Sequence, residues 1–191
     1  MNLKIDVTFP DNRDFTGKLS LRDETGKVIA GPFFAYGRSD GATAAKHGNP
    51  SRNSLLKYGN TPTGDYRVPV IVNTGAGTNY GSRSYGPHEA LVLEPTGGQA
   101  LESKINGRTG LMIHGGDPGA NGRLRATHGC VRLSNDDMRK LLDAIAKVHD
   151  DPVSRQCRVT QIAASIGPEG DPVSGEDVGD PPPLPGDIIF P

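Results

Sequence analysis

The chain opens with alternating hydrophobic and polar residues, a pattern typical of β-strands with one buried face. The first ten residues place Leu3, Ile5, Val7 and Phe9 on one side. Further along, Leu19 and Leu21 alternate before the turn-forming residues 23–26, and residues 27–30 resume a strand. We therefore expect an N-terminal strand followed by a hairpin.

Several later segments also have the composition of strands. These are residues 66–72, 89–94, 109–114 and 158–162. Pro69 favours a sheet edge for the first of them, and Cys157 is expected to point inward beside the last.

The stretches between these strands are rich in Gly, Ser, Asn and Ala. Residues 37–64 are expected to form a long surface loop, which makes them a candidate cover for a binding cleft. His47 within it is expected to be an ordinary solvated side chain. Residues 73–88 are expected to form an irregular loop, and the turn-rich 95–98 with a short segment around Ile105 separates two of the predicted strands.

One helix is clearly predicted after residue 134. Ser134 is a suitable N-cap, and Asp137 three residues later completes an approximate capping box. One apolar stripe follows at helical spacing, formed by Met138, Leu141, Leu142 and Ile145. The fold class predicted from these patterns is mainly β with few helices.

Composition limits the remaining possibilities. The 191 residues, with 26 Gly, 16 Pro and no Trp, fit one domain rich in turns. A net charge of −1 gives no electrostatic reason to expect nucleic acid as a partner, and no apolar run is long enough to span a membrane. Residues 167–191 contain seven Pro and six acidic residues, so we expect a domain at 1–166 and a disordered or extended tail at 167–191.

The candidate chemistry lies between residues 111 and 142. His114 and His128 flank a single thiol, Cys130, and Gly115 and Gly129 leave the backbone beside them uncovered. This arrangement indicates a cysteine nucleophile with a histidine base and nearby N–H donors. Two alternatives stay open: Cys130 as a small buried apolar residue, or a zinc site made by His114, His128 and Cys130.

Two motifs resemble one family. His114 is followed by Thr127-His128-Gly129-Cys130, which resembles the H-x(n)-[ST]-H-G-C signature of the L,D-transpeptidase (YkuD-type) catalytic domain. Upstream, residues 61–66 resemble the T-P-x-G-x-[FY] segment of the same family. The resemblance covers about residues 3–163, with the 12 residues between His114 and Thr127 being slightly fewer than the family usually has. It implies a YkuD-like β-sandwich of mixed sheets, with a helix packed after the cysteine motif.

The resemblance also implies roles for individual residues. Cys130 would be the nucleophile and His114 its base and ion-pair partner, with the Gly115 carbonyl fixing the imidazole tautomer. The N–H groups of His128, Gly129 and Cys130 would form the oxyanion hole, and His128 would shape the pocket. Further expectations place Thr127 in a hydrogen bond within the turn and Arg132 on a substrate carboxylate. No metal and no cofactor are expected.

The substrate implied by the family is a peptidoglycan stem tetrapeptide. Cys130 would form a thioester with the third residue and pass it to an amine, giving a 3→3 cross-link or D-amino acid exchange, or to water, giving L,D-carboxypeptidase activity. The rival hypothesis is a non-catalytic cell-wall-binding or zinc-binding β-domain.

Such a substrate implies action in the periplasm or cell wall. The N-terminus lacks the basic start and apolar stretch of a signal peptide, so we expect either a mature form from which the signal has been removed or a non-Sec export route, for example as a secreted antibacterial effector. A secretion-apparatus component or an immunity protein is then an expected partner. Because a disulfide would inactivate the nucleophile, Cys157 is expected to be buried, with neither cysteine in a disulfide.

Overall fold

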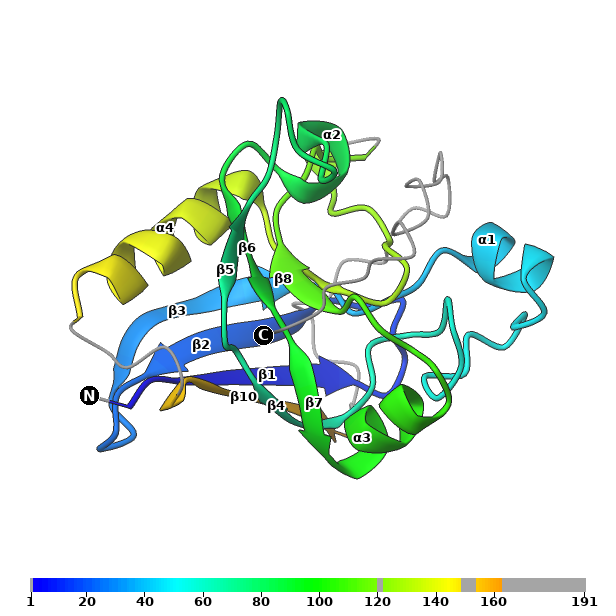
Figure 1. Ribbon diagram of the computed structural model, residues 1–191, viewed down its shortest axis with the longest axis horizontal. Helices are drawn as coiled ribbons and strands as arrows, with labels where there is room; N and C mark the ends of the chain where they lie inside the picture. Colours follow the sequence, from blue (N-terminus) through cyan, green and yellow to red (C-terminus); the bar gives the residue numbers. More distant parts are fainter. Residues whose placement is uncertain (1, 120–121, 149–153, 163–191) are drawn as a thin grey trace.

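Two β-sheets form the body of the protein in its computed structural model (Figure 1). The structure describes residues 2–119, 122–148 and 154–162. The six-stranded sheet has the order β3-β2-β1-β10-β4-β7, and the four-stranded sheet, which crosses in front of it in Figure 1, has the order β5-β6-β8-β9. Short helices lie around these sheets, so the prediction of a mainly β fold is confirmed.

The strands of the six-stranded sheet are β1 (Lys4–Pro10), β2 (Gly17–Arg22), β3 (Val28–Ala35), β4 (Gly64–Arg67), β7 (Glu94–Gly97) and β10 (Gln156–Ile162). Those of the four-stranded sheet are β5 (Ile71–Asn73), β6 (Glu89–Val92), β8 (Met112–His114) and β9 (Val131–Arg132). The helices are α1 (Gly41–Lys46), α2 (Ser82–Tyr85), α3 (Gly98–Ile105) and α4 (Asn135–Ala146).

The N-terminal predictions are confirmed. Leu3, Ile5, Val7 and Phe9 are buried along one face of β1. The expected hairpin is β2 and β3, which pair antiparallel. Strand β1 pairs antiparallel with β2 and parallel with β10, so the two ends of the described chain meet at the centre of the larger sheet.

Two segments predicted as single strands each pass from one sheet to the other. The chain leaves the larger sheet after β4 and enters the smaller one at β5, with Pro69 between them. Proline has no backbone N–H, so a ladder cannot continue through it, and the strand predicted over 66–72 is broken there. The strand predicted over 89–94 likewise ends at β6, and the chain continues beyond Leu93 as β7 in the other sheet.

Three helices were not predicted. The loop expected over 37–64 contains α1, whose N-cap Asp40 accepts a hydrogen bond from the N–H of Thr43 at 2.6 Å. The loop expected over 73–88 contains α2, and α3 occupies the short segment around Ile105. Residues 95–97, expected to be a turn, belong to β7. These short helices carry no long apolar stripe, which explains why periodicity missed them.

The predicted helix is present as α4. The Ser134 side chain accepts the N–H of Asp137 at 3.1 Å, and Met138, Leu141 and Ile145 are buried while Leu142 is partly buried. The apolar stripe holds the helix against the core and against β3 (Figure 1). Because α4 follows β9 directly, it fixes the position of the cysteine motif.

Apolar clusters cover both faces of the four-stranded sheet. Leu91, Ile113 and Val131 belong to the main core between the two sheets. Alternate residues of the same strands, including Val92, Met112 and the adjacent Cys130, form a second cluster on the opposite face. That second face carries the candidate site.

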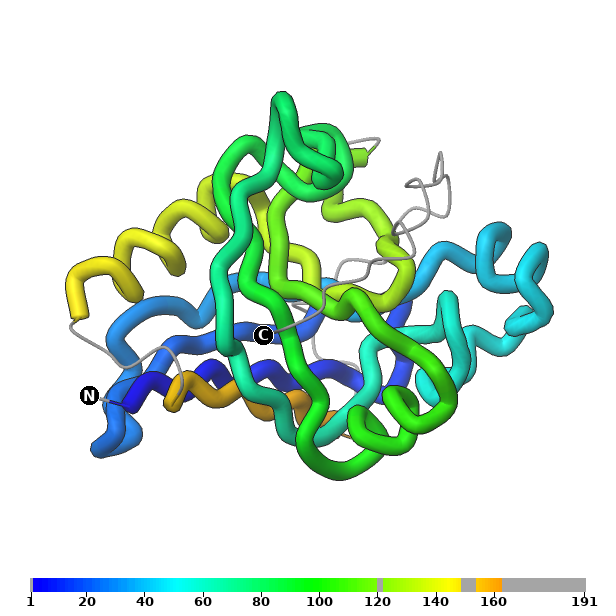
Figure 2. Tube along the Cα trace, viewed as in Figure 1, coloured from blue at the N-terminus to red at the C-terminus, as the bar shows by residue number. Residues whose placement is uncertain are grey.

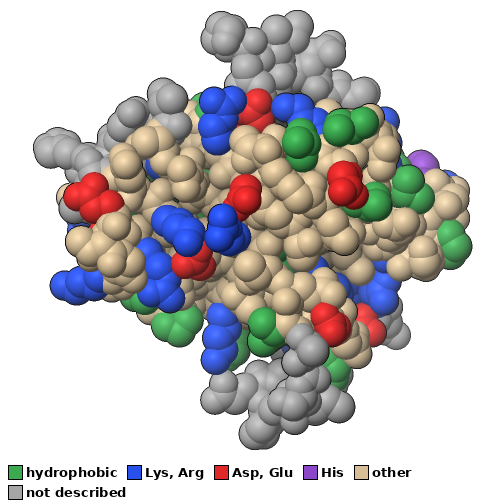
Figure 3. Space-filling view, turned by 90° about the horizontal axis from the view of Figure 1, so that it is seen from below, with side chains coloured by type: hydrophobic (Ala, Val, Ile, Leu, Met, Phe, Trp, Pro, Cys, Tyr) green, Lys and Arg blue, Asp and Glu red, His purple; other side chains and the backbone are tan. Residues whose placement is uncertain are grey.

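The outer surface is mixed in charge. Seen from below, basic and acidic side chains are interspersed with scattered hydrophobic ones (Figure 3). Ion pairs also link neighbouring strands, for example Arg22 with Asp6 at 2.8 Å and Arg158 with Asp65 at 2.7 Å. The tail predicted over 167–191 lies outside the described residues.

Candidate active site

The histidine and cysteine motifs are brought together by two adjacent parallel strands. In the β8–β9 pair, Ile113 lies opposite Val131 and His114 lies opposite Arg132. Cys130 immediately precedes β9. Because side chains alternate along a strand, His114 projects from the same face as Met112, and this is the face that also carries Cys130. The parallel register thus puts Cys130 beside Met112, on the face from which His114 also projects.

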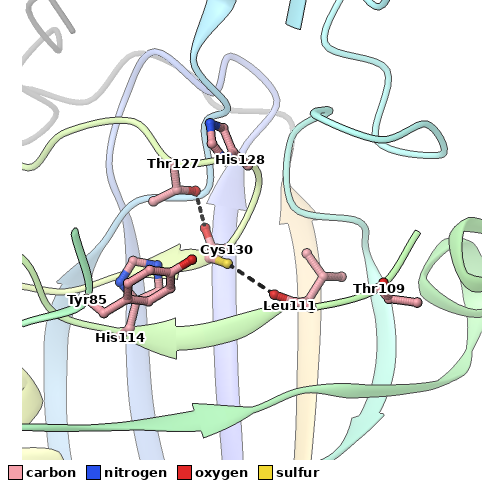
Figure 4. Close-up of a pocket in the computed structure, with 8 residues that line it drawn as sticks. Tyr85, Thr109, Leu111, His114, Thr127, His128 and Cys130 are labelled. Atoms are coloured by element: carbon pink, nitrogen blue, oxygen red, sulfur yellow. Dashed lines mark hydrogen bonds between the residues drawn. The ribbon is translucent and has the colours of Figure 1, made fainter. Parts of the chain in front are cut away.

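A small pocket opens on this face (Figure 4). Its lining consists of Tyr85, Thr109, Gly110, Leu111, His114, Thr127, His128 and Cys130. The Cys130 side chain is largely buried, and its Sγ lies 3.7 Å from the carbonyl oxygen of Gly110. Four residues predicted from sequence, namely His114, Thr127, His128 and Cys130, therefore line one pocket.

The tautomer of His114 follows from its backbone partner. Nδ1 lies 2.6 Å from the carbonyl oxygen of Gly115, the contact expected from sequence. A carbonyl oxygen only accepts hydrogen bonds, so Nδ1 carries the proton and donates it. Nε2 is then the nitrogen with the lone pair, which is the atom that a general base uses.

The surroundings keep the His114 ring neutral. Burial, followed by the positive charge of Arg132, lowers the pKa of His114 to about 3, against the opposing hydrogen bonds to the backbone of Gly115 and Ser84. Burial and Arg132 thus favour the neutral ring, and the ion pair of His114 with Cys130 stays a prediction. At neutral pH the resting ring therefore carries no charge, and its Nε2 is unprotonated.

Thr127 organises the turn that carries Cys130. Its Oγ1 accepts the N–H of Gly129 at 2.9 Å and donates to the carbonyl oxygen of Cys130 at 3.2 Å (Figure 4). The predicted hydrogen bond of Thr127 within the turn is thus present. The same contact corrects another expectation: the Gly129 N–H is engaged by Thr127 in this conformation and does not point to an oxyanion.

Gly129 fits where no other residue would. Its φ of +104° lies in the region that favours glycine, and a Cβ would collide with the guanidinium of Arg108. The Arg108 side chain is buried and donates to four backbone carbonyls, those of Ser54, Gly59, Asn60 and His128. Arg108, which sequence analysis did not single out, therefore ties the 54–60 loop to the cysteine turn.

The upstream motif supports the same turn. Oγ1 of buried Thr61 lies 3.2 Å from the carbonyl oxygen of Cys130 and 3.2 Å from that of Gly37. The Tyr66 hydroxyl donates to the carbonyl of Pro62 at 2.7 Å, which fixes the turn between Thr61 and β4. The two sequence motifs are thus two parts of one hydrogen-bonded unit around Cys130.

Arg132 does not reach the pocket. Its side chain is fully buried, and Nη2 donates to the carbonyl oxygen of Asp117 at 3.2 Å. Arg125 donates to the same oxygen at 3.0 Å and to the carbonyl of Arg83 at 2.6 Å. The expectation that Arg132 holds a substrate carboxylate is corrected: both arginines hold the 83–85 segment against the loop after His114.

Asn135 fixes the turn after His114. Its Oδ1 accepts the N–H of Gly116 at 2.7 Å, and a Cβ on Gly115 would collide with that oxygen. The Gly115 carbonyl, which holds His114, is therefore oriented by the first residue of α4. No sequence signal distinguished Asn135 from an ordinary first-turn residue of a helix.

Aromatic side chains wall the pocket on the His114 side. The Tyr85 ring lies 4.8 Å from the His114 ring, and Tyr80 lies 5.1 Å from Tyr85, both measured between centroids. Both tyrosines lie in the segment 73–88, which was expected from sequence to be irregular. Tyr85 lines the pocket, and Tyr80 supports it from behind.

The second cysteine lies elsewhere. Cys157 in β10 is 1 % exposed, and neither cysteine forms a disulfide. Burial, followed by the charges of Asp6 and Asp65, raises the pKa of the Cys157 thiol. The prediction of a buried Cys157 with neither thiol oxidised to a disulfide is confirmed.

Comparison with known families decides the assignment. The family model of the L,D-transpeptidase catalytic domain, YkuD, matches residues 18–174. The chain belongs to this family. YkuD domains act on cell-wall peptidoglycan and in general depend on a cysteine. No curated protein matches the chain closely enough to count as a relative.

The YkuD assignment confirms the resemblance and the β-sandwich expected from it. The matched region begins in β2 and ends at residue 174, so it extends eight residues beyond the boundary predicted at 166. Two further findings concern this YkuD domain. Within the described ranges, no helix is long and apolar enough to cross a membrane. Among the same residues, no three His, Cys, Asp or Glu side chains gather where they could hold a metal ion, a group that the zinc-site alternative would need.

Proposed function

We propose that Cys130 is the nucleophile and His114 the general base of a peptidoglycan acyl transfer. The substrate is a stem tetrapeptide, cleaved between its third and fourth residues. The observation that carries the proposal is that His114 and Cys130 line one pocket, and the 2.6 Å contact of His114 Nδ1 with the Gly115 carbonyl assigns the lone pair to Nε2. Burial of the His114 ring at the end of β8 favours its neutral form, which is the form that a general base needs.

The proposed reaction has two halves. Nε2 accepts the thiol proton as the sulfur bonds to the carbonyl carbon, and the carbonyl electron pair moves onto oxygen. When the tetrahedral intermediate collapses, the C–N bond breaks and the proton passes from Nε2 to the departing amine of the fourth residue. A thioester between Cys130 and the third residue results. In the second half, His114 deprotonates the acceptor, which displaces the sulfur and regenerates the thiol.

The proposed oxyanion hole uses backbone N–H groups of the cysteine turn. Since Thr127 engages the N–H of Gly129, the proposal assigns this role to the N–H groups of His128 and Cys130. Thr61, Thr127 and Arg108 hold the carbonyls of the same turn and so orient its amides before substrate arrives. Preorganised donors of this kind typically contribute about 10²- to 10³-fold in rate each.

The molecule that accepts the acyl group from the thioester determines which of three activities results. An amine of a second stem gives a 3→3 cross-link, a free D-amino acid gives exchange, and water gives L,D-carboxypeptidase activity. Incubation of the protein with tetrapeptide muropeptides, followed by mass spectrometry, distinguishes them by a dimer, an exchanged fourth residue or its loss. If none of these products forms, the enzyme hypothesis is contradicted and the wall-binding hypothesis is favoured.

We further propose the periplasm as the place of action, because peptidoglycan lies there, and delivery as an antibacterial effector. Expression in a bacterial host with and without an added export signal tests both points. Lysis or rounding is expected only with the signal and is lost in Cys130→Ala. Co-purification with an immunity protein or a secretion-apparatus component tests the expected partners, and toxicity of the unexported form contradicts the proposed place of action.

A further inference from the structure

Three contacting rings lead outward from the pocket, on the side opposite Tyr85 (Figure 4). His128 lines the pocket, and its ring centroid lies 5.3 Å from that of Tyr58 in an edge-to-face arrangement. Tyr58 stacks on His47 with centroids 4.1 Å apart and the ring planes inclined by 15°. We call His128, Tyr58 and His47 the aromatic ladder. Burial decreases along it, since His128 and Tyr58 are half-buried and His47 is exposed.

The aromatic ladder is held by the backbone around it. Tyr58 has a φ of +60°, a left-handed conformation uncommon for residues other than glycine. Arg108 secures the carbonyls of the next two residues, Gly59 and Asn60. The chain after β3 also runs beside the cysteine turn (Figure 2), where Ser39 pairs with Thr127 and His128. These contacts fix the position of the Tyr58 ring next to the cysteine turn.

The length of the aromatic ladder matches a specific part of the proposed substrate. Three stem residues separate the attacked carbonyl from the sugar that carries the stem, and an extended chain spans about 3.3–3.6 Å per residue. The two steps of the ladder, 5.3 and 4.1 Å between ring centroids, start at a pocket-lining ring and together reach at most about as far as three extended residues. A stem bound with its third residue at Cys130 and running along the ladder brings its sugar to His47.

The chemistry also fits a sugar. The C–H groups on one face of a pyranose ring carry partial positive charge, which the negative face of an aromatic ring attracts. The imidazole nitrogens of His47 and the Tyr58 hydroxyl add hydrogen-bonding groups for sugar hydroxyls and N-acetyl groups. An exposed ring at the end of a stacked pair offers both kinds of contact.

We propose that the aromatic ladder is a subsite for the glycan, with the sugar that bears the stem packed on Tyr58 and His47. The inference rests on the proposed function and names a second part of the substrate, so that the enzyme recognises stems still attached to their glycan. His47, expected from sequence to be only a solvated side chain, is thereby assigned to substrate binding.

The test compares two substrates, the free tetrapeptide and the same tetrapeptide attached to its disaccharide. The native protein is expected to show a kcat/KM about 2- to 10-fold higher for the disaccharide form, the range of one aromatic contact. Tyr58→Ala and His47→Ala should each remove this preference by raising KM for the disaccharide form only. Tyr58→Phe, which keeps the ring, should retain it.

Leu56→Ala provides the matched control, because Leu56 is 44 % exposed in the same loop but is not part of the ladder. It should leave both substrates unaffected. Equal losses for both substrates in Tyr58→Ala and His47→Ala would mean that the rings only support the loop, and unchanged kinetics would mean that they bind nothing; either result overturns the subsite.

Failure of the proposed function gives a different result, since the native protein would then convert neither substrate. The subsite is still decided in that case by calorimetric titration of the protein with each compound. Stronger binding of the disaccharide form, lost in His47→Ala, supports it, and equal binding of the two compounds overturns it.

Discussion

The two cysteines of this chain occupy contrasting regions. Cys157 lies within β10, paired with Ile5 and Tyr66, and its side chain faces the main core. Cys130 lies in the turn before β9, on the outer face of the smaller sheet, in a pocket with His114. Both side chains are buried, at 1 % and 7 % exposure respectively. Burial therefore does not separate them; their partners do.

The difference shows how a fold produces a reactive thiol. In a regular strand the sheet satisfies the backbone, and the Cys157 side chain lies in the main core, where burial disfavours a thiolate. A turn needs side chains to satisfy its backbone, and around Cys130 these come from Thr61, Thr127 and Arg108. The same groups hold the turn still next to a base. We therefore expect the reactive thiol to lie in a turn, beyond the regular hydrogen bonds of the sheet.

The largest expected effect is the loss of activity in Cys130→Ala, and without it the distinction between the two cysteines would not hold. Cys130→Ala should lower the turnover of tetrapeptide muropeptides by about 10⁴-fold or more, because the nucleophile is gone. Cys157→Ala is the matched control and should keep full turnover, since that thiol contacts only the core. Similar losses in both variants, measured by quantitative mass spectrometry of products, would mean that position in the fold does not distinguish the two thiols.

A second test varies pH, because the His114 region is expected to lose stability at acidic pH and the Cys157 region at alkaline pH. Burial and Arg132 lower the pKa of His114 from 6.5 to about 3, so between these values the unfolded chain binds a proton that the folded one does not. Stability from this group is present above pH 6.5 and is lost as pH falls toward 3, by a total on the order of 5 kcal/mol. Urea unfolding from pH 7 to 4 should show the decline, and His114→Gln should reduce its slope.

The Cys157 region should behave in the opposite way. Burial raises the pKa of its thiol above 9.0, so the unfolded chain loses that proton first as pH rises, and stability falls in the alkaline range. Cys157→Ala should flatten the alkaline slope and leave the acid slope intact. If the acid slope is unchanged in His114→Gln, the ring is not buried in its neutral form as described.

Some parts of the fold could be predicted from the sequence, and others could not. Strands β1 and β2 and helix α4 were predictable because one face of each is apolar at a regular period, from Leu3 to Phe9 and from Met138 to Ile145. The crossings at Pro69 and Leu93 were not, because a strand that changes sheets keeps its composition and changes only its partners. The short helices α1, α2 and α3 carry too few apolar residues to give a period.

In the site, Cys130, His114 and the Gly115 contact were predictable from the motifs. Arg132 was misassigned because a charged residue beside a catalytic motif favours a ligand role in sequence, whereas its guanidinium is buried against backbone carbonyls. Arg108 and Asn135 were missed since their importance depends on which carbonyl or N–H lies opposite them. Such partners are set by the tertiary fold and leave no local pattern.

A third, intermediate effect sharpens the account of His114. Asn135→Ala removes the acceptor of the Gly116 N–H and frees the turn that carries the Gly115 carbonyl, so kcat should fall about 10- to 100-fold while KM changes little. Asn135→Asp keeps an oxygen acceptor and should recover much of the rate, with an acid limb moved to higher pH because its charge favours a protonated ring. A normal kcat in Asn135→Ala would show that the turn holds its shape without this bond.

The smallest expected effect concerns the upstream motif. Thr61→Val removes a hydroxyl that contacts the carbonyls of Gly37 and Cys130, and should lower the free energy of unfolding by about 1–2 kcal/mol with only a few-fold loss of rate. Thr63→Val is the matched control, because its hydroxyl contacts only Gln99 at the surface. Equal thermal melting of the two variants would indicate that Thr61 does not stabilise the cysteine turn.

The most direct measurement is the mass of the protein itself during reaction. Rapid acid quenching of the enzyme with tetrapeptide, followed by intact and peptide mass spectrometry, should show the tripeptide acyl group on Cys130 as a thioester cleaved by hydroxylamine. Cys157 should remain unmodified, and His114→Ala should not accumulate the adduct at a comparable rate. Product formation without any adduct on Cys130, or an adduct on another residue, would contradict the account.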